Sequence, residues 1–127
     1  MTADILLVDD NSIQAVTRKA ILMRSSHSVA MASNGQQALA MIEESGSTRP
    51  VRLVVTDHLM PGMNGPEFVT RLRSRYPRLP VLVLSGMGDA EDEYRDLDVL
   101  FRVKPFPPDQ LIALVRSLLD EPMSRTA

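Results

Sequence analysis

Cysteine is absent from the 127-residue sequence, and no apolar run is long enough to cross a membrane. The lack of cysteine excludes disulfides, thiolate nucleophiles and zinc or iron–sulfur sites that need cysteine ligands. A membrane helix needs about 20 apolar residues. Met1 is followed by polar Thr2 rather than by the basic and apolar segments of a signal peptide. We therefore expect a soluble chain of the cytoplasm, without a membrane contact.

An excess of either charge is also missing. The 14 Lys and Arg residues nearly balance the 16 Asp and Glu residues, which leaves a net charge of −2. Without a basic field, we expect no direct contact with nucleic acid. Hydrophobic residues make up 44% and charged residues 24%, as in ordinary globular chains. The length suits one domain, and we place its core at about 4–119 and a polar tail at 120–127.

Short apolar runs alternate with helical patterns along the sequence. Continuous apolar character over a few residues is typical of strands that are buried on both faces of a parallel sheet. Helices are predicted to begin near Asn11, Asn34 and Pro66, and a last one covers Pro107 to Leu119. The predicted strands are 5–8, 28–32, 51–56, 81–84 and 99–103. The alternation predicts a doubly wound α/β fold with five strands and five helices.

The helix after Asn11 carries apolar residues at helical spacing. Ile13, Val16, Ala20 and Met23 form one face of it. This spacing is typical of an amphipathic helix.

Polar residues follow four of the predicted strands. Asp9 and Asp10 follow the first strand, Asp57 the third, Ser85 the fourth and Lys104 the fifth. In open α/β sheets, ligands bind beyond these carboxyl ends, which meet at one edge. Taken singly, each residue could be a turn, a cap or a solvated charge. Their order along the strands instead favours a single site.

The residue types indicate phosphoryl transfer. Carboxylates crowded together repel one another unless a cation lies between them, and oxygen ligands with room for water favour Mg²⁺ over Zn²⁺. A carboxylate can also be the nucleophile. Asp57 is the best candidate, because the pair Asp9–Asp10 is better suited to holding the metal. Lys104 would neutralise charge on the transferred group, and the Ser85 hydroxyl would donate a hydrogen bond to one of its oxygens.

Four segments of the chain resemble the receiver domains of response regulators in two-component signalling. They are LLVDD (6–10), TDHLMPGMNGPEF (56–68), LVLSG (82–86) and VKPF (103–106). The resemblance runs from about Asp4 to Leu119. It implies a flavodoxin-like sheet of strand order 2-1-3-4-5. It also implies phosphorylation of Asp57 by a histidine kinase or a histidine phosphotransfer domain, with an unknown protein downstream.

The same resemblance implies how the site works. Asp10, Asp57 and the backbone carbonyl of Leu59 would bind Mg²⁺ directly, whereas Asp9 would act through bound water. The Lys104–Pro105 bond would be cis. Ser85 and Lys104 would sense the phosphoryl group and shift the face built from the fourth helix, fifth strand and fifth helix. We expect only Mg²⁺-dependent self-phosphorylation and self-dephosphorylation, so the chain would not be an enzyme with an external substrate.

The chain departs from the receiver pattern between Ser85 and Lys104. This stretch is shorter than usual by about 3 to 4 residues, roughly one helical turn, and it is strongly acidic. We predict a short, weakly held fourth helix, whose like charges limit self-association to a monomer or a weak dimer. Phe101 stands where many receivers have a switching Tyr, and without a hydroxyl we expect a damped switch. We place His58 on the rim of the site.

Other classes of protein use related residues or the same fold. A haloacid-dehalogenase-like phosphohydrolase also has an Asp nucleophile, but its nucleophile lies in a D-x-D pattern at the first strand and its acidic pair comes late. A flavodoxin-like electron carrier would need a Ser/Thr/Gly-rich phosphate loop after the first strand, and none is present. Within the receiver family, a stand-alone regulator and the excised receiver of a hybrid histidine kinase both remain open. In either case, we expect the chain to act through another protein.

Overall fold

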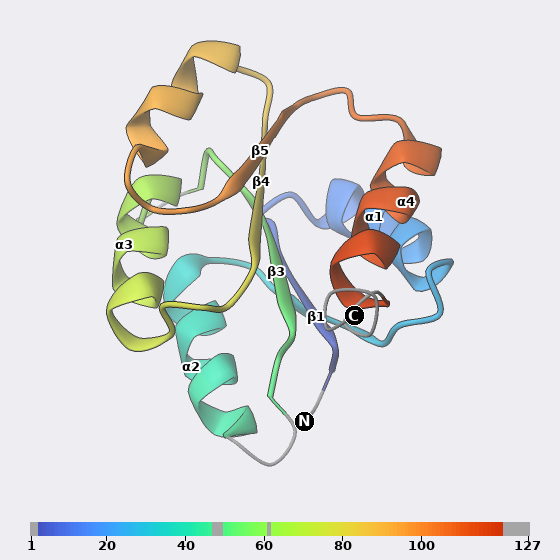
Figure 1. The fold of residues 1–127 in the computed structure, drawn as a ribbon, viewed down its shortest axis with the longest axis horizontal. Coiled ribbons are helices and arrows are strands. Elements are labelled where there is room, and N and C mark those ends of the chain that lie inside the picture. Colours follow the sequence, from blue (N-terminus) through green and yellow to red (C-terminus); the bar gives the residue numbers. More distant parts are fainter. Residues whose placement is uncertain (1–2, 47–49, 61, 121–127) are drawn as a thin grey trace, which may run out of the picture.

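The computed structural model describes residues 3–46, 50–60 and 62–120 and contains a five-stranded parallel sheet (Figure 1). The strand order is β2-β1-β3-β4-β5, as predicted. In the described part of the chain, no helix has the length and apolar character needed to cross a membrane. The elements follow one another as β1 (Ile5–Val8), α1 (Ser12–Met23), β2 (Val29–Ala32), α2 (Gly35–Ser45), β3 (Leu53–Asp57), α3 (Gly65–Arg75), β4 (Val81–Ser85), the 3-10 helix η1 (Gly88–Tyr94), β5 (Leu100–Val103) and α4 (Pro108–Leu119).

Helices cover both faces of the sheet. The helices α2, α3 and η1 lie on one face, and α1 and α4 lie on the other (Figure 1). Alternate residues of β1 point to the two layers, Leu6 and Val8 to the first and Ile5 and Leu7 to the second. Because both faces are covered, β1, β3 and β4 are buried along their whole length. This double burial is why their sequences are continuously apolar rather than alternating.

Asparagine side chains cap three of the helices. Asn11, Asn34 and Asn64 each accept a hydrogen bond from a backbone N–H of the first helical turn, at 2.7 to 2.9 Å. These bonds satisfy donors that the helix itself leaves unpaired. The predicted helix starts at Asn11 and Asn34 are confirmed, and Pro66 lies in the first turn of α3 as expected.

The apolar face that the sequence gives α1 is not the face that packs on the sheet. Its buried residues are Ala15 and Leu22, whereas Ile13 is 80% exposed and Val16 is 61% exposed; Ala20 and Met23 are exposed as well. The helix packs on the core that α4 shares with β1, and the small Ala15 permits close approach there. Periodicity identifies an apolar stripe, but it does not show which stripe meets the sheet.

The link between β4 and β5 contains the fourth helical element. It is short, as predicted, and forms the 3-10 helix η1 rather than an α-helix. Ala90 and Tyr94 are its buried residues, so two side chains hold it to the core. Its acidic residues all face solvent, namely Asp89, Glu91, Asp92 and Glu93.

Tyr94 joins η1 to the segment that follows β3. Its hydroxyl lies 2.7 Å from Nδ1 of His58, and its ring packs against Phe101 with centroids 5.9 Å apart. The hydroxyl also occupies the space above Gly65, where an added Cβ would lie 1.9 Å from the Tyr94 oxygen. The missing side chain at position 65 is therefore a requirement for the position of Tyr94.

We expect Gly65→Ala to lower the free energy of unfolding by about 1–3 kcal/mol, because the new methyl group displaces the Tyr94 hydroxyl. In a Tyr94→Phe background, the same substitution should cost less, since the oxygen is gone. Urea unfolding of the two single variants and the double variant measures this coupling. Strictly additive effects would show that Gly65 and Tyr94 do not share this space.

Candidate functional site

Three carboxylates meet at the carboxyl ends of β1 and β3. Val8 pairs in register with Thr56, so the next residues along the two strands, Asp9 and Asp57, lie side by side. One carboxylate oxygen each from Asp9, Asp10 and Asp57 lies within 4.8 Å of the other two. Asp9 and Asp57 are buried, whereas Asp10 is exposed. The convergence predicted from the sequence is thus present in the structure.

Lys104 reaches this cluster from the end of β5. Its Nζ lies 3.0 Å from Oδ1 of Asp57, close enough for a charge-assisted hydrogen bond. The Lys104–Pro105 bond is cis, as expected. The backbone N–H of Lys104 donates to the carbonyl of Ser85 at 2.7 Å. This bond ties the ends of β4 and β5 together beside the carboxylates.

Ser85 ends β4 at the same edge of the sheet. Leu84 is the register partner of Asp57, so Ser85 lies one residue beyond the carboxylate along the neighbouring strand. Its Oγ accepts a hydrogen bond from the backbone N–H of Met87 at 2.9 Å and donates one to the carbonyl of Met87 at 3.2 Å. The Ser85 hydroxyl therefore holds the first turn of the loop that leads to η1.

Two residues of α1 also enter the site, and neither was predicted from the sequence. Gln14 Nε2 donates to Oδ2 of Asp9 at 2.7 Å and to Oδ2 of Asp57 at 3.1 Å. Arg18 Nη1 lies 3.2 Å from Asp9 Oδ2 and 3.6 Å from Asp57 Oδ1. The sequence does indicate that Gln14 and Arg18 lie on one side of the helix, because residues four apart share a helix face. The asparagine cap fixes where the helix begins.

Leu59 and Phe101 are the two remaining residues of the predicted site, and they differ in exposure. Leu59 follows Asp57 by two residues in the loop after β3, and its side chain is 65% exposed. The role of its carbonyl as a metal ligand stays a prediction. Phe101 of β5 is buried against Tyr94, and its role as a switch likewise stays a prediction.

His58 is not on the rim of the site. It is only 5% exposed, and its Nδ1 faces the hydroxyl of Tyr94 at 2.7 Å. Its Nε2 lies 3.7 Å from a carboxylate oxygen of Glu93. The prediction was wrong because β3 buries side chains on both of its faces, so the side chain after the buried Asp57 is buried on the opposite face.

The donor set fits a hard divalent cation. Three carboxylates supply only oxygen ligands, and the exposure of Asp10 leaves one side open to water. Mg²⁺ prefers such sites because it keeps part of its hydration shell. The described residues of the cluster include no sulfur or imidazole ligand, which Zn²⁺ would favour.

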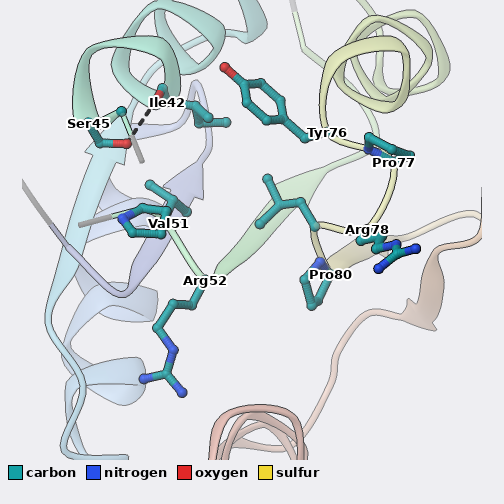
Figure 2. Close-up of a pocket in the computed structure, with 11 residues that line it drawn as sticks. Ile42, Ser45, Val51, Arg52, Tyr76, Pro77, Arg78 and Pro80 are labelled. Carbon is teal, nitrogen blue, oxygen red and sulfur yellow. Dashed lines mark hydrogen bonds between the residues drawn. The ribbon is translucent and has the colours of Figure 1, made fainter. Parts of the chain in front are cut away.

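An apolar pocket lies away from these carboxylates. Figure 2 shows Ile42, Val51 and Tyr76 among the side chains around it, near the carboxyl ends of α2 and α3. Its volume is about 500 Å³. Its charged side chains, among the residues that the structure describes, are Arg52 and Arg78. With no carboxylate in that lining, the pocket lacks the acidic oxygen ligands of the carboxylate cluster.

Sequence and structure comparisons agree on the class. The response regulator receiver domain matches residues 5–116, and the chain therefore belongs to this family of signalling domains. It is 35% identical to the response regulator MprA of Mycobacterium bovis, over 94% of this chain and 51% of MprA. It is 32% identical to the sensor kinase CckA of Brucella abortus, over 94% of this chain and 13% of CckA.

A solved structure gives the same assignment. The chemotaxis protein CheY4 of Vibrio cholerae matches with a TM-score of 0.79 and 27% identity, over 94% of this chain and 100% of that one. The chain spans about half the length of the response regulators that it matches. It is a receiver with a CheY-like fold, and nothing in these matches supports a haloacid-dehalogenase-like phosphohydrolase.

The burial of Tyr94 predicts an alkaline loss of stability. Burial, together with the carboxylates of Glu93 and Asp57, raises the pKa of Tyr94 above its ordinary value. The folded state therefore keeps a proton that the unfolded chain releases above about pH 10. The resulting stabilisation is fully present below that pH and declines as the pH rises.

Between pH 8 and about pH 10.5, wild type should lose about 1 kcal/mol more free energy of unfolding than Tyr94→Phe. The other titrating groups are common to both chains and cancel in the comparison. Urea unfolding at the two pH values measures the difference. Parallel losses in the two proteins would contradict the assignment of Tyr94 as the buried phenol.

Proposed function

We propose that Asp57 is the phosphoacceptor of this receiver. The observation that carries the proposal is the placement of a buried carboxylate between a cation and further carboxylates. Lys104 lies 3.0 Å from one oxygen of Asp57, and Asp9 and Asp10 lie beside it. A carboxylate held in this way can attack phosphorus, while the ammonium group stabilises the charge on the phosphoryl oxygens.

The donor we propose is a phosphohistidine of a histidine kinase or a histidine phosphotransfer domain. An oxygen of Asp57 forms the new bond to phosphorus as the bond from phosphorus to the histidine nitrogen breaks, and the imidazole takes up a proton. Asp10, Asp57 and the carbonyl of Leu59 would hold Mg²⁺, with Asp9 acting through water. The ion would neutralise charge on the transferred group.

The signal is proposed to leave through η1, β5 and α4. Phosphorylation replaces the single charge of the Asp57 carboxylate with the nearly doubly charged phosphoryl group, and the Ser85 hydroxyl is near enough in register to be drawn toward it. Movement of Ser85 would pull on Met87, to which it is bonded, and so on the start of η1. Phe101 can swing in response but has no hydroxyl to hold either position, which supports a damped switch.

We propose two alternatives for the whole protein in which this receiver acts, a response regulator and a hybrid histidine kinase. Its relatives include a response regulator twice its length and a sensor kinase of which it covers 13%. Either parent would use the same exchange of phosphoryl groups. We propose that the exchange takes place in the cytoplasm. The only reactions of the chain would be its own phosphorylation and the hydrolysis of the phosphorylated form. The output would be contact with another protein rather than with nucleic acid.

Acetyl phosphate with Mg²⁺ should add one phosphoryl group to wild type, as measured by intact mass. Asp57→Asn should gain none, because the nucleophilic oxygen is lost. Asp89→Asn, which removes an exposed carboxylate of η1, is the matched control and should be phosphorylated like wild type. The proposal would be contradicted if wild type stayed unmodified both with acetyl phosphate and with several histidine kinases. Full modification of Asp57→Asn would contradict it as well.

Addition of beryllofluoride, which stands in for the phosphoryl group, should leave the protein a monomer or a weak dimer by light scattering. The exposed carboxylates of η1 repel a second copy across this face. A variant that neutralises Asp89, Glu91, Asp92 and Glu93 to their amides should associate more strongly at low salt. A tight dimer of the wild type would contradict the proposed role of these charges.

A further inference from the structure

Arg18 places a fixed positive charge inside the carboxylate cluster. Its guanidinium bridges two acids, with Nη1 at 3.2 Å from Asp9 Oδ2 and 3.6 Å from Asp57 Oδ1. The side chain of Arg18 is 12% exposed, and those of Asp9 and Asp57 are nearly inaccessible. These two ion pairs are therefore largely shielded from solvent. A charge interaction is stronger in such a shielded place than at an open surface.

The position of Arg18 follows from the way α1 starts. Asn11 caps the helix at the edge of the site, so the side chains one and two turns later rise beside the carboxylates. Gln14 on the first turn bonds to Asp9 and Asp57, and Arg18 on the next turn reaches the same two acids. The two residues lie on one face of the helix because they are four residues apart.

Arg18 and Lys104 share one oxygen of the phosphoacceptor. Lys104 Nζ lies 3.0 Å from Asp57 Oδ1, the oxygen that Arg18 also faces. Two cations therefore already balance the two buried carboxylates, and the amide of Gln14 satisfies further oxygen lone pairs. A divalent ion entering the site would meet acids whose charge is partly neutralised.

We infer that Arg18 is an internal counter-ion that competes with the divalent cation for Asp9 and Asp57. This inference rests on the proposed function, because it concerns the metal site of the same phosphoacceptor. The ion and the guanidinium repel each other and are attracted to the same oxygens. Binding of Mg²⁺ then requires Arg18 to loosen its contact with Asp9, which weakens the affinity for the ion.

The structure offers room for that movement. A cavity of about 500 Å³ adjoins Arg18 between α1 and the segment after β5, and its lining includes Thr17, Ile21 and Phe106. The guanidinium can turn toward this cavity while the methylene groups of the side chain stay in contact with apolar atoms. Gln14 can keep its bond to Asp9 in either position, since it carries no charge.

A titration with MgCl₂ by calorimetry tests the inference without any phosphorylation. Arg18→Gln should bind Mg²⁺ about fivefold more tightly than wild type, because one repelling charge is gone. Lys19→Gln, the same change of charge at the next position of α1, is the matched control and should shift the dissociation constant by less than about twofold. Arg18→Lys, which keeps the charge, should stay close to wild type.

Thermal unfolding gives a second readout. In a chelator, Arg18→Gln should unfold at a lower temperature than wild type, since Asp9 and Asp57 lose their counter-ion. Saturating Mg²⁺ should stabilise this variant more than it stabilises wild type, because the ion binds only the folded state. Arg18→Met serves as a second neutral variant if Arg18→Gln fails to fold.

The outcomes separate this inference from the proposed function. Wild type that binds Mg²⁺, with no gain of affinity in either neutral variant, overturns the role of Arg18 and leaves the metal site intact. An equal gain in Arg18→Lys overturns it as well, since charge would not be the cause. Failure of every variant to bind Mg²⁺ overturns the metal site and the competition together.

Discussion

The repulsion between the buried carboxylates of Asp9 and Asp57 is the constraint on which the rest of the site depends. The parallel register of β1 and β3 places them side by side, and the covering of both sheet faces keeps most water away. Positive charge must therefore be brought to them from elsewhere in the chain. Lys104 supplies it from β5 and Arg18 from α1, so three separate parts of the fold are tied to one electrostatic requirement.

The fold was largely predictable because a sheet that is covered on both faces needs strands with a recognisable sequence pattern. The runs in β1, β3 and β4 are continuously apolar since neither face meets water, and asparagine caps mark where α1 and α2 begin. The orientation of α1 was not predictable in this way. Ile13 and Val16 look like core residues, yet the helix packs through Ala15 and Leu22, and only the tertiary contact decides which stripe is inside.

The site was predictable where chemistry and strand order coincide. Asp9, Asp57 and Lys104 each follow a strand, so the parallel sheet brings them together regardless of their distance along the chain. Gln14 and Arg18 were missed because long side chains on a helix can reach several different neighbours. The contact between His58 and Tyr94 was not predicted for another reason, since 36 residues separate them and no periodic pattern links a loop to a 3-10 helix.

The contact between Gly65 and Tyr94 limits the order in which this sequence can change over time. Any larger residue at position 65 would collide with the phenol oxygen and would also lie close to the backbone oxygen of His58, so such a substitution costs less after Tyr94 has lost its hydroxyl. The reverse order passes through a destabilised intermediate. Two positions 29 residues apart thus have a favoured order of substitution, although neither belongs to the carboxylate cluster.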